Sequence, residues 1–203
     1  MATPTESASA FPDPAAVAGG ERPPRPAATI VVVRDGAQGL EVLLSRRAER
    51  GDHNSGAWVF PGGIVENHDA LAHAAVAGLD DVDASKRLGV ASGGLDYYVA
   101  AIRECFEESG LLFARADGAE LVDLDGSDAA RLAPWRGALH RGERAIAELC
   151  AAEGLRLAAD RLVYLSHWLT PLAWHPGAVP FIAANMAWRS CARPRACSSP
   201  SIA

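Results

Sequence analysis

The sequence predicts one mixed α/β domain with short appendages, built as a sandwich of helices on a mixed sheet. The chain has 203 residues, of which 49% are hydrophobic and 22% are charged. It is therefore long enough to bury one sizeable core and too short for two full domains. The expected strands alternate irregularly with helices, without the repeated strand–helix–strand units of a fully parallel sheet.

Composition divides the chain into three segments. Residues 1–26 are rich in Ala, Pro, Ser and Gly, and offer too little apolar surface to offset ordering, so we expect disorder there. The domain is expected over 27–172, with an insertion at about 70–95. Residues 173–203 are expected to form an irregular tail, whose Cys, Pro, Arg and Ser bias also fits an out-of-frame translation. The sheet could therefore be incomplete at its C-terminal end.

Apolar runs and breaking residues predict the elements of the domain. Two β-rich runs joined across a glycine-containing loop predict a hairpin, and a short strand then meets Pro61, Gly62 and Gly63, which mark a sharp turn. The expected elements are, in order, strands at 29–34, 40–47 and 57–63, a helix and loop at 70–95, a helix at 96–109, a strand at 111–115, helices at 127–140 and 143–154, and a strand at 161–171.

The helix expected at 96–109 has two different faces. At helical spacing it carries an apolar set (Tyr98, Ile102, Phe106) and an acidic set (Glu104, Glu107, Glu108). Carboxylates near the C-terminal end of a helix repel one another, and the helix dipole disfavours each by about 0.3–1 kcal/mol. A hard divalent cation such as Mg²⁺ would neutralise them and keep waters for a phosphate substrate. The alternative is an ordinary solvated acidic face.

The residues around this helix resemble the Nudix box, G-x5-E-x7-R-E-U-x-E-E-x-G-U, where U is a bulky apolar residue. The second half is complete in the run from Arg103 to Leu111, RECFEESGL. In the first half, Gly63 is followed after five residues by Asp69 in place of Glu, and residues 70–102 stand where seven are expected. Such an insertion is tolerable as a surface loop, because closure entropy grows slowly with loop length.

An upstream segment narrows the resemblance to Nudix enzymes that cleave coenzyme A. They carry an element similar to L-L-T-x-R-[SA]-x3-R-x3-G-x3-F-P-G-G. Here LLSRRA at 43–48 precedes Gly56 and FPGG at 60–63 at the matching spacing, with Ser45 in place of Thr and Asp52 at the second Arg position. The long insertion inside the box is similar to that of one coenzyme A diphosphatase branch.

The resemblance implies a Nudix-type α/β/α sandwich and a metal-dependent hydrolase of nucleoside diphosphate derivatives. In the family, the box acids surround one or more Mg²⁺ or Mn²⁺ ions that bridge a diphosphate. Carried onto this chain, the metal ligands are Glu104, Glu107 and Glu108, the catalytic residues are Glu107, Glu108 and Arg103, the substrate-binding residues are Arg46, Gly62 and Gly63, and Glu66 and Asp69 are secondary. A solvated strand-end arginine is the alternative for Arg46.

Coenzyme A or an acyl-coenzyme A is the favoured substrate, cleaved to 3′,5′-ADP and the (acyl-)4′-phosphopantetheine half; ADP-ribose and NADH are alternatives. Another class also stays open, because no Asp or Glu follows Asp160. Many Nudix enzymes draw a further acid from a later loop. The chain could therefore be a degenerate or truncated Nudix module that binds a metal or nucleotide without turnover.

Other features exclude competing functions. The net charge of −6 argues against an electrostatically bound nucleic acid. The sequence contains no run of about 18 apolar residues, so we expect no membrane-spanning helix. The first residues lack the basic and apolar regions of a secretory signal, and the four cysteines form no C-x-x-C pair. We expect a cytoplasmic protein with reduced thiols, a small nucleotide substrate, and a homodimer as one possible assembly.

Two further groups of residues have ordinary structural interpretations. Asp80, Asp81 and Asp83 lack the glycine and terminal Glu of a calcium loop, so a solvated loop is expected there. His167 and Trp168 are expected to pack the last strand of the domain against the sheet.

Overall fold

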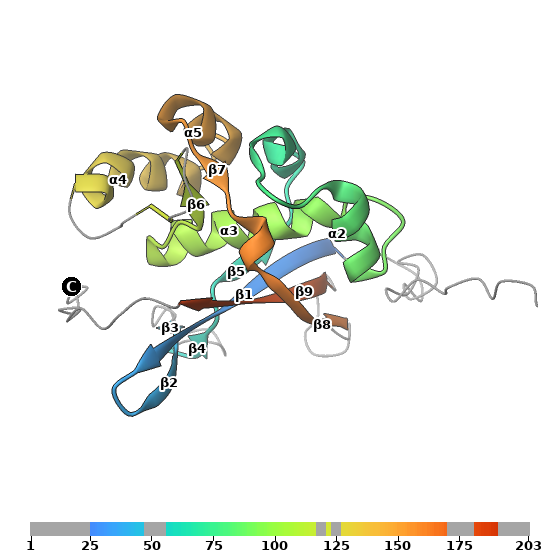
Figure 1. Ribbon diagram of the computed structural model, residues 1–203, viewed down its shortest axis with the longest axis horizontal. Coiled ribbons are helices and arrows are strands. Elements are labelled where there is room, and N and C mark those ends of the chain that lie inside the picture. Colours follow the sequence, from blue (N-terminus) through green and yellow to red (C-terminus); the bar gives the residue numbers. More distant parts are fainter. Residues whose placement is uncertain (1–24, 47–55, 117–120, 123–126, 170–180, 191–203) are drawn as a thin grey trace, which may run out of the picture.

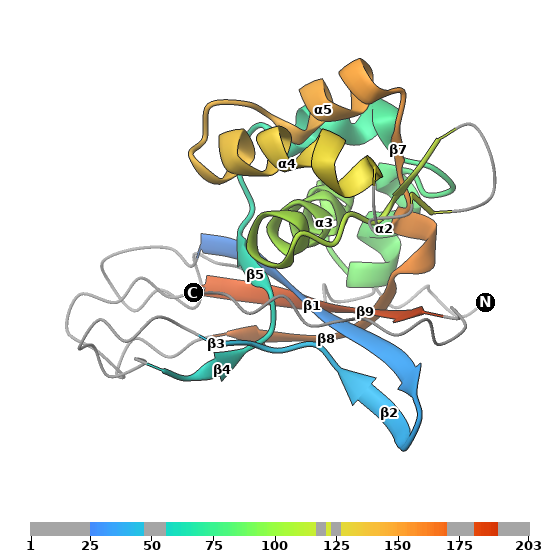
Figure 2. The ribbon, with the colours of Figure 1, turned by 90° about the vertical axis from the view of Figure 1, so that its left-hand side faces the viewer.

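The computed structural model describes residues 25–46, 56–116, 121–122, 127–169 and 181–190. They form a mixed sheet with a layer of helices on one of its faces (Figures 1 and 2). The predicted mixed α/β architecture is confirmed. An α/β/α sandwich has two helical layers. The described residues form one of them, which packs on one face of the sheet.

The main sheet is built on its first strand, β1 (Arg25–Gly36). The order of the strands is β2 (Gly39–Val42), β1, β9 (Phe181–Ser190) and β8 (Val163–Leu169), and β5 (Gly62–Ile64) also pairs with β1. β1 and β2 form the predicted antiparallel hairpin. β9 runs parallel to β1 and antiparallel to β8, so the sheet is mixed.

Two short ladders flank the main sheet. One pairs β3 (Ser45–Arg46) with β4 (Trp58–Val59), and the other pairs β6 (Ala114–Arg115) with β7 (Arg156–Leu157). The first ladder leads directly into β5, and the second lies beside the C-terminal half of the helical layer (Figure 1).

The helical layer is organised around α3 (Gly94–Ser109), which lies across the sheet. Its neighbours are η1 (Asp69–Ala75), α2 (Asp81–Leu88), α4 (Ser127–His140) and the short η2 (Ala159–Arg161), which leads into β8. The remaining helix, α5 (Ile146–Glu153), packs on η1. The apolar face predicted for α3 is buried, with Tyr98, Ile102 and Phe106 at most 2% exposed. Gly110 ends the helix at φ +79°, the left-handed conformation expected of a capping glycine.

The insertion differs from the expected surface loop. Its second half, expected to be irregular, forms α2. Ala72 of η1, Val76 just after η1, and Ala84 and Leu88 of α2 all contribute to the core. The apolar pattern within 70–95 extends over too few residues to distinguish a packed helix from a loop. The insertion therefore supports α3 instead of bulging away from it.

The acidic run within the insertion caps α2 and does not form a solvated loop. Asp80 Oδ1 accepts a hydrogen bond from Asp83 N at 2.8 Å, which is a helix N-cap. Asp81 accepts from Gly93 N at 3.0 Å and from Leu95 N at 2.9 Å, so it ties the start of α2 to the start of α3. Burial opposes ionisation of Asp81, but these two backbone donors outweigh it and lower the carboxyl pKa.

The C-terminal region also differs from the sequence expectation. Residues 181–190, within the segment expected to be irregular, form β9 between β1 and β8. The run FIAANMAW has the apolar content of a buried strand, which the Cys and Pro bias of its surroundings obscured. On β8, Trp168 is 64% exposed and donates to Ser166 Oγ, so its indole does not pack into the core.

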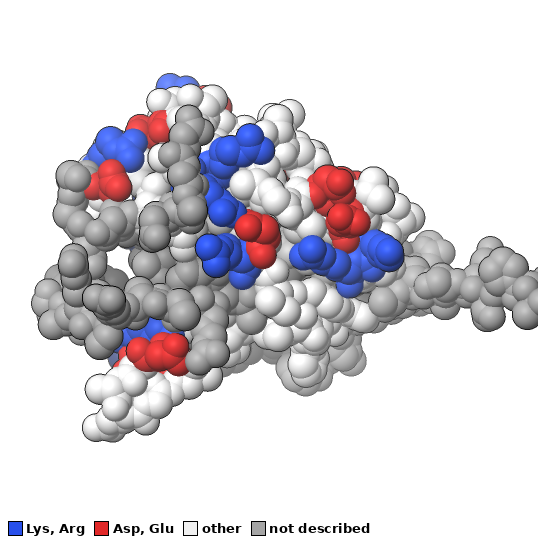
Figure 3. All heavy atoms as spheres, viewed as in Figure 1, with Lys and Arg blue, Asp and Glu red and all other residues white. Residues whose placement is uncertain are grey.

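Two observations concern the surface and the thiols. On the face seen in Figure 3, basic and acidic side chains lie interspersed. Among the described residues, no helix is both long and apolar enough to cross a bilayer. Cys105 and Cys150 are buried free thiols, and burial raises the pKa of each to about 12.

Candidate active site

A buried arginine joins the two halves of the box across the insertion. Arg103 on α3 is 2% exposed, and its partner Asp69, at the start of η1, is fully buried. The two form a bidentate ion pair, with Nε donating to Oδ1 at 2.8 Å and Nη2 donating to Oδ2 at 3.1 Å. Nη2 also donates to Ile64 O at 2.8 Å, and Asp69 Oδ2 accepts from Glu66 N at 2.8 Å. The loop after β5 is therefore fastened to α3.

The remaining nitrogen of Arg103 faces the box glutamates. Nη1 donates to Glu104 Oε1 at 2.8 Å and to Glu107 Oε1 at 3.1 Å. The side chains of Glu104 and Glu107 are 14% and 9% exposed. Arg103 is held by Asp69 and Ile64 from the other side, and it draws these two carboxylates toward its Nη1.

The glycine turn brings backbone against the same carboxylates. Gly62 N donates to Glu108 Oε2 at 3.2 Å. A Cβ built on Gly63 would lie 2.3 Å from Glu104 Oε1, so any side chain there would displace that carboxylate. Gly63 therefore suits the close approach of β5 to α3, whereas Gly62 suits the close approach of β5 to β1, where a Cβ would lie 2.5 Å from Ala28 O.

The electrostatics of the cluster favour a cation. One buried guanidinium faces carboxylates from Asp69, Glu104 and Glu107, with Glu108 beside them. Burial raises the pKa of Glu104; Arg103 counteracts this, and the charges of Glu107 and Glu108 raise the pKa further. Burial lowers the pKa of Arg103, but its acidic partners outweigh burial and raise it. Arg103 therefore stays charged and is outnumbered by acids.

The donor chemistry suits Mg²⁺ or Mn²⁺, but the carboxylates are not converged on one point. Among the described residues, no group of three His, Cys, Asp or Glu side chains is arranged to hold an ion as it stands. Glu104 and Glu107 turn toward Arg103, and Glu108 turns toward Gly62. These side chains lie on adjacent turns of one rigid helix, so rotation about their own bonds would let them share a cation.

The other predicted site residues lie around this cluster. Arg46 is on β3, opposite Trp58 of β4, on the ladder that leads into Gly62 and Gly63. The carboxylate of Glu66 is partly exposed and lies 3.1 Å from His68 Nδ1, whereas the Glu66 backbone N–H joins the Arg103 network through Asp69. Asp69, in contrast, occupies the centre of that network.

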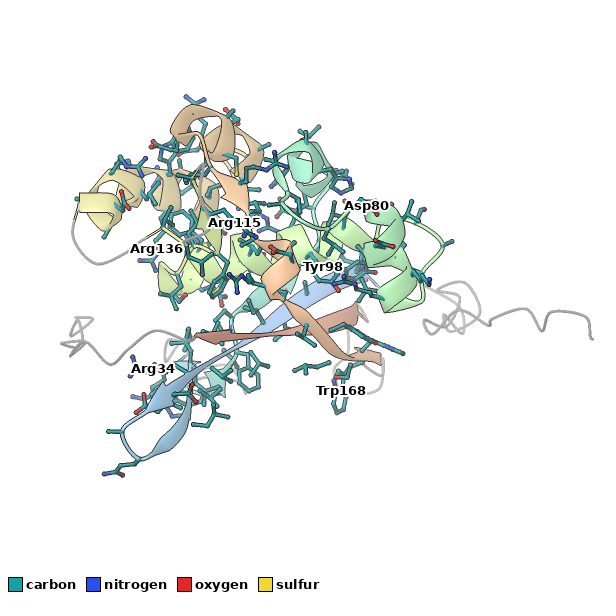
Figure 4. All side chains as sticks on the ribbon, in the orientation of Figure 1. Arg34, Asp80, Tyr98, Arg115, Arg136 and Trp168 are labelled. Carbon is teal, nitrogen blue, oxygen red and sulfur yellow. The ribbon has the colours of Figure 1, made fainter. Side chains whose placement is uncertain are left out.

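Two residues of α4 that sequence reasoning did not select also meet the acidic end of α3. Arg136 donates to backbone carbonyls of α3, and His140 Nδ1 lies 3.9 Å from Glu107 Oε2. They are four residues apart and so share one side of α4. Figure 4 labels Arg136 beside the C-terminal end of α3. Only the tertiary packing of α4 on α3 brings them there.

Comparison with known proteins gives matches in both sequence and structure. A model of the NUDIX domain matches residues 23–76, which include β1, the glycine turn and Asp69. The chain is 29% identical over 160 residues to an acyl-coenzyme A diphosphatase, NUDT19, of Xenopus laevis, covering 65% of this chain. It spans only 42% of the length of that relative. A crystal structure of a NUDIX hydrolase from Alicyclobacillus acidocaldarius is similar, with a TM-score of 0.64 at 28% identity, over 84% of this chain and 72% of that one.

Proposed function

We infer that this chain, as a member of the Nudix hydrolase superfamily, is a hydrolase, and we propose that it cleaves the diphosphate of coenzyme A or an acyl-coenzyme A with the help of Mg²⁺ or Mn²⁺. The products would be 3′,5′-ADP and (acyl-)4′-phosphopantetheine. The observation that carries the proposal is the network of Arg103 with Asp69, Glu104 and Glu107, against which Gly63 is packed.

The acids have roles that follow from their positions. Glu104, Glu107 and Glu108 would hold the cation, which when bound neutralises charge on the diphosphate and makes a water easier to deprotonate. Arg103 is buried and fully engaged, so it acts by orienting Glu104 and Glu107 while it is itself held by Asp69. Asp69 is thus a structural partner of Arg103.

The reaction needs one water and one proton acceptor. The water oxygen attacks one phosphorus, the bridging P–O bond breaks, and its electron pair leaves with the departing phosphate. Glu107 or Glu108 accepts the proton of the attacking water. Gly62 and Gly63 carry no side chain that would block approach of a diphosphate to these glutamates. Arg46, on the ladder leading into this turn, would meet a substrate phosphate.

The choice of coenzyme A rests on the upstream motif and on the name of the Xenopus relative. ADP-ribose and NADH share the diphosphate and differ in what flanks it. The alternative from another functional class is a module that binds a metal or nucleotide without turnover. The absence of Asp and Glu from residues 161–203 favours this alternative.

Turnover by the purified chain distinguishes these proposals. Coenzyme A, an acyl-coenzyme A, ADP-ribose and NADH are each incubated with Mg²⁺ or Mn²⁺, and the products are resolved by chromatography. We expect 3′,5′-ADP from coenzyme A, at least about 100-fold slower formation by Glu107→Gln, and an unchanged rate for Glu143→Gln, which alters an exposed ion pair. Faster cleavage of ADP-ribose or NADH would replace the substrate assignment. No turnover by folded, metal-binding protein would favour the binding module.

A further inference from the structure

The C-terminal end of α3 is held by a side chain from another helix. Gly110 N donates to Phe106 O at 2.9 Å and closes the last turn. Arg136, on α4, donates from Nε to Glu107 O at 2.9 Å and from Nη2 to Glu108 O at 2.8 Å. Arg136 therefore satisfies two successive carbonyls that the helix end leaves without intrahelical partners.

The guanidinium of Arg136 fits this helix end closely. A Cβ built on Gly110 would lie 3.6 Å from Nη1 and 3.8 Å from Cζ, so the guanidinium lies over the capping glycine in ordinary contact. Its planar fork can donate to two neighbouring carbonyls at once, which a lysine ammonium cannot copy. A positive charge is also favourable at the negative end of a helix. The contact offsets some of the destabilisation caused by acids at this end of α3.

We propose that Arg136 is a positioning residue for the box glutamates. It fixes the backbone of Glu107 and Glu108, and so sets the directions in which their carboxylates leave α3. The inference rests on the proposed function, because it gives Arg136 a role toward a cation held by those carboxylates. Its hydrogen bonds run to main-chain oxygens, so it acts through α3. His140, on the same side of α4, lies 3.9 Å from Glu107 Oε2, which places α4 against the acidic side of this turn.

Loss of charge and loss of alignment have opposite effects on cation binding. Removal of a positive charge beside the acids would, by itself, strengthen the binding of a divalent cation. Loss of the fork, however, frees the last turn of α3 and misaligns two ligands, which weakens binding. The sign of the change in affinity therefore separates a positioning residue from a mere charge.

The direction of this change is measured by titrating the protein with Mn²⁺ in the absence of substrate and monitoring free Mn²⁺ by electron paramagnetic resonance. The variants are Arg136→Met, Arg136→Lys, and Arg141→Met as a control with the same charge change at an exposed pair with Glu143. We expect the dissociation constant to rise about tenfold in both Arg136 variants, as for other partners that orient metal ligands. The control should keep the wild-type value. Tighter or unchanged binding in Arg136→Met, or full recovery in Arg136→Lys, would overturn the proposal.

A metal-free readout tests the same contact. Hydrogen exchange of the 106–111 segment should be faster in both Arg136 variants and unchanged in Arg141→Met, because the last turn opens more often without the fork. If Arg136→Met does not fold, Arg136→Lys decides the question. Glu107→Gln separates the two proposals: wild-type Mn²⁺ affinity in that variant would contradict the proposed function, whereas weak binding there with wild-type affinity in the Arg136 variants would contradict only the positioning role.

Discussion

Replacement of Asp69 by Asn tests the ion pair that fastens the insertion to α3. Asn keeps the shape of the side chain but loses its charge. Its amide nitrogen would replace either Oδ1, which accepts from Arg103 Nε, or Oδ2, which accepts from Arg103 Nη2 and Glu66 N, so in both orientations a donor would face a donor. Removal of one member of a buried ion pair typically costs about 3–5 kcal/mol. Glu104 and Glu107 still face Arg103, so we expect the lower end, about 3 kcal/mol.

The measurement is urea unfolding of metal-free protein, with a thermal melt as a second probe. In a chain of this size, about 3 kcal/mol corresponds to a fall in Tm of roughly 6–12 °C. Asp128→Asn is the matched control, since Asp128 pairs with Arg131 at a partly exposed site and should contribute less than about 1 kcal/mol. Asp69→Glu keeps the carboxylate but adds a methylene at a fully buried position, for an expected cost of about 1–3 kcal/mol.

One result would refute this reasoning. If Asp69→Asn unfolds within about 0.5 kcal/mol of wild type at an unchanged urea dependence, then the ion pair does not stabilise the join between the insertion and α3. Arg103 would then need another source of its fixed position.

Three further predictions follow from other contacts. Gly63→Ala should push the Glu104 carboxylate aside and weaken Mn²⁺ binding about tenfold in a titration followed by electron paramagnetic resonance. Stability should fall by about 1–3 kcal/mol, since that carboxylate gives up its hydrogen bond from the buried Arg103. Asp81→Asn should cost about 1 kcal/mol at pH 7; because the folded pKa lies below the ordinary 3.8, that difference should shrink as the pH falls below 3.8 in urea titrations. In a double variant, Cys191→Ser with Cys197→Ser, the buried thiols of Cys105 and Cys150 should resist a disulfide reagent at pH 8 until the protein unfolds. Because burial raises the folded pKa of both thiols to about 12, the free energy of unfolding should also fall as the pH rises from 9 toward 12.

The sequence was most informative where chemistry and local periodicity coincide. The helix predicted at 96–109 begins at Gly94 and ends at Ser109, because its apolar spacing and its capping glycine are local signals. The order of the box residues singled out both Asp69 and Arg103, although a long insertion separates them, but only the structure shows that the two form an ion pair. The roles of the individual site residues stay predictions.

Other features depend on tertiary packing and left little trace in the sequence. Arg136 was one of many arginines on an expected helix, and only the placement of α4 against α3 brings it to the carbonyls of Glu107 and Glu108. The packing of the insertion depends on α3, because η1 and α2 bury their apolar residues against it. β9 has an apolar run of its own, but the Cys, Pro, Arg and Ser bias of the surrounding sequence is typical of an irregular tail.

Direct titration of the wild-type chain with Mn²⁺, beside Glu107→Gln and Glu143→Gln, tests the central claim that the acidic end of α3 holds a divalent cation. The account predicts saturable binding by wild type, the same affinity in the exposed-site control, and binding at least about tenfold weaker in Glu107→Gln. If wild type does not bind the ion, or if Glu107→Gln binds it as tightly as the control, these glutamates are an acidic surface and the proposed chemistry is wrong.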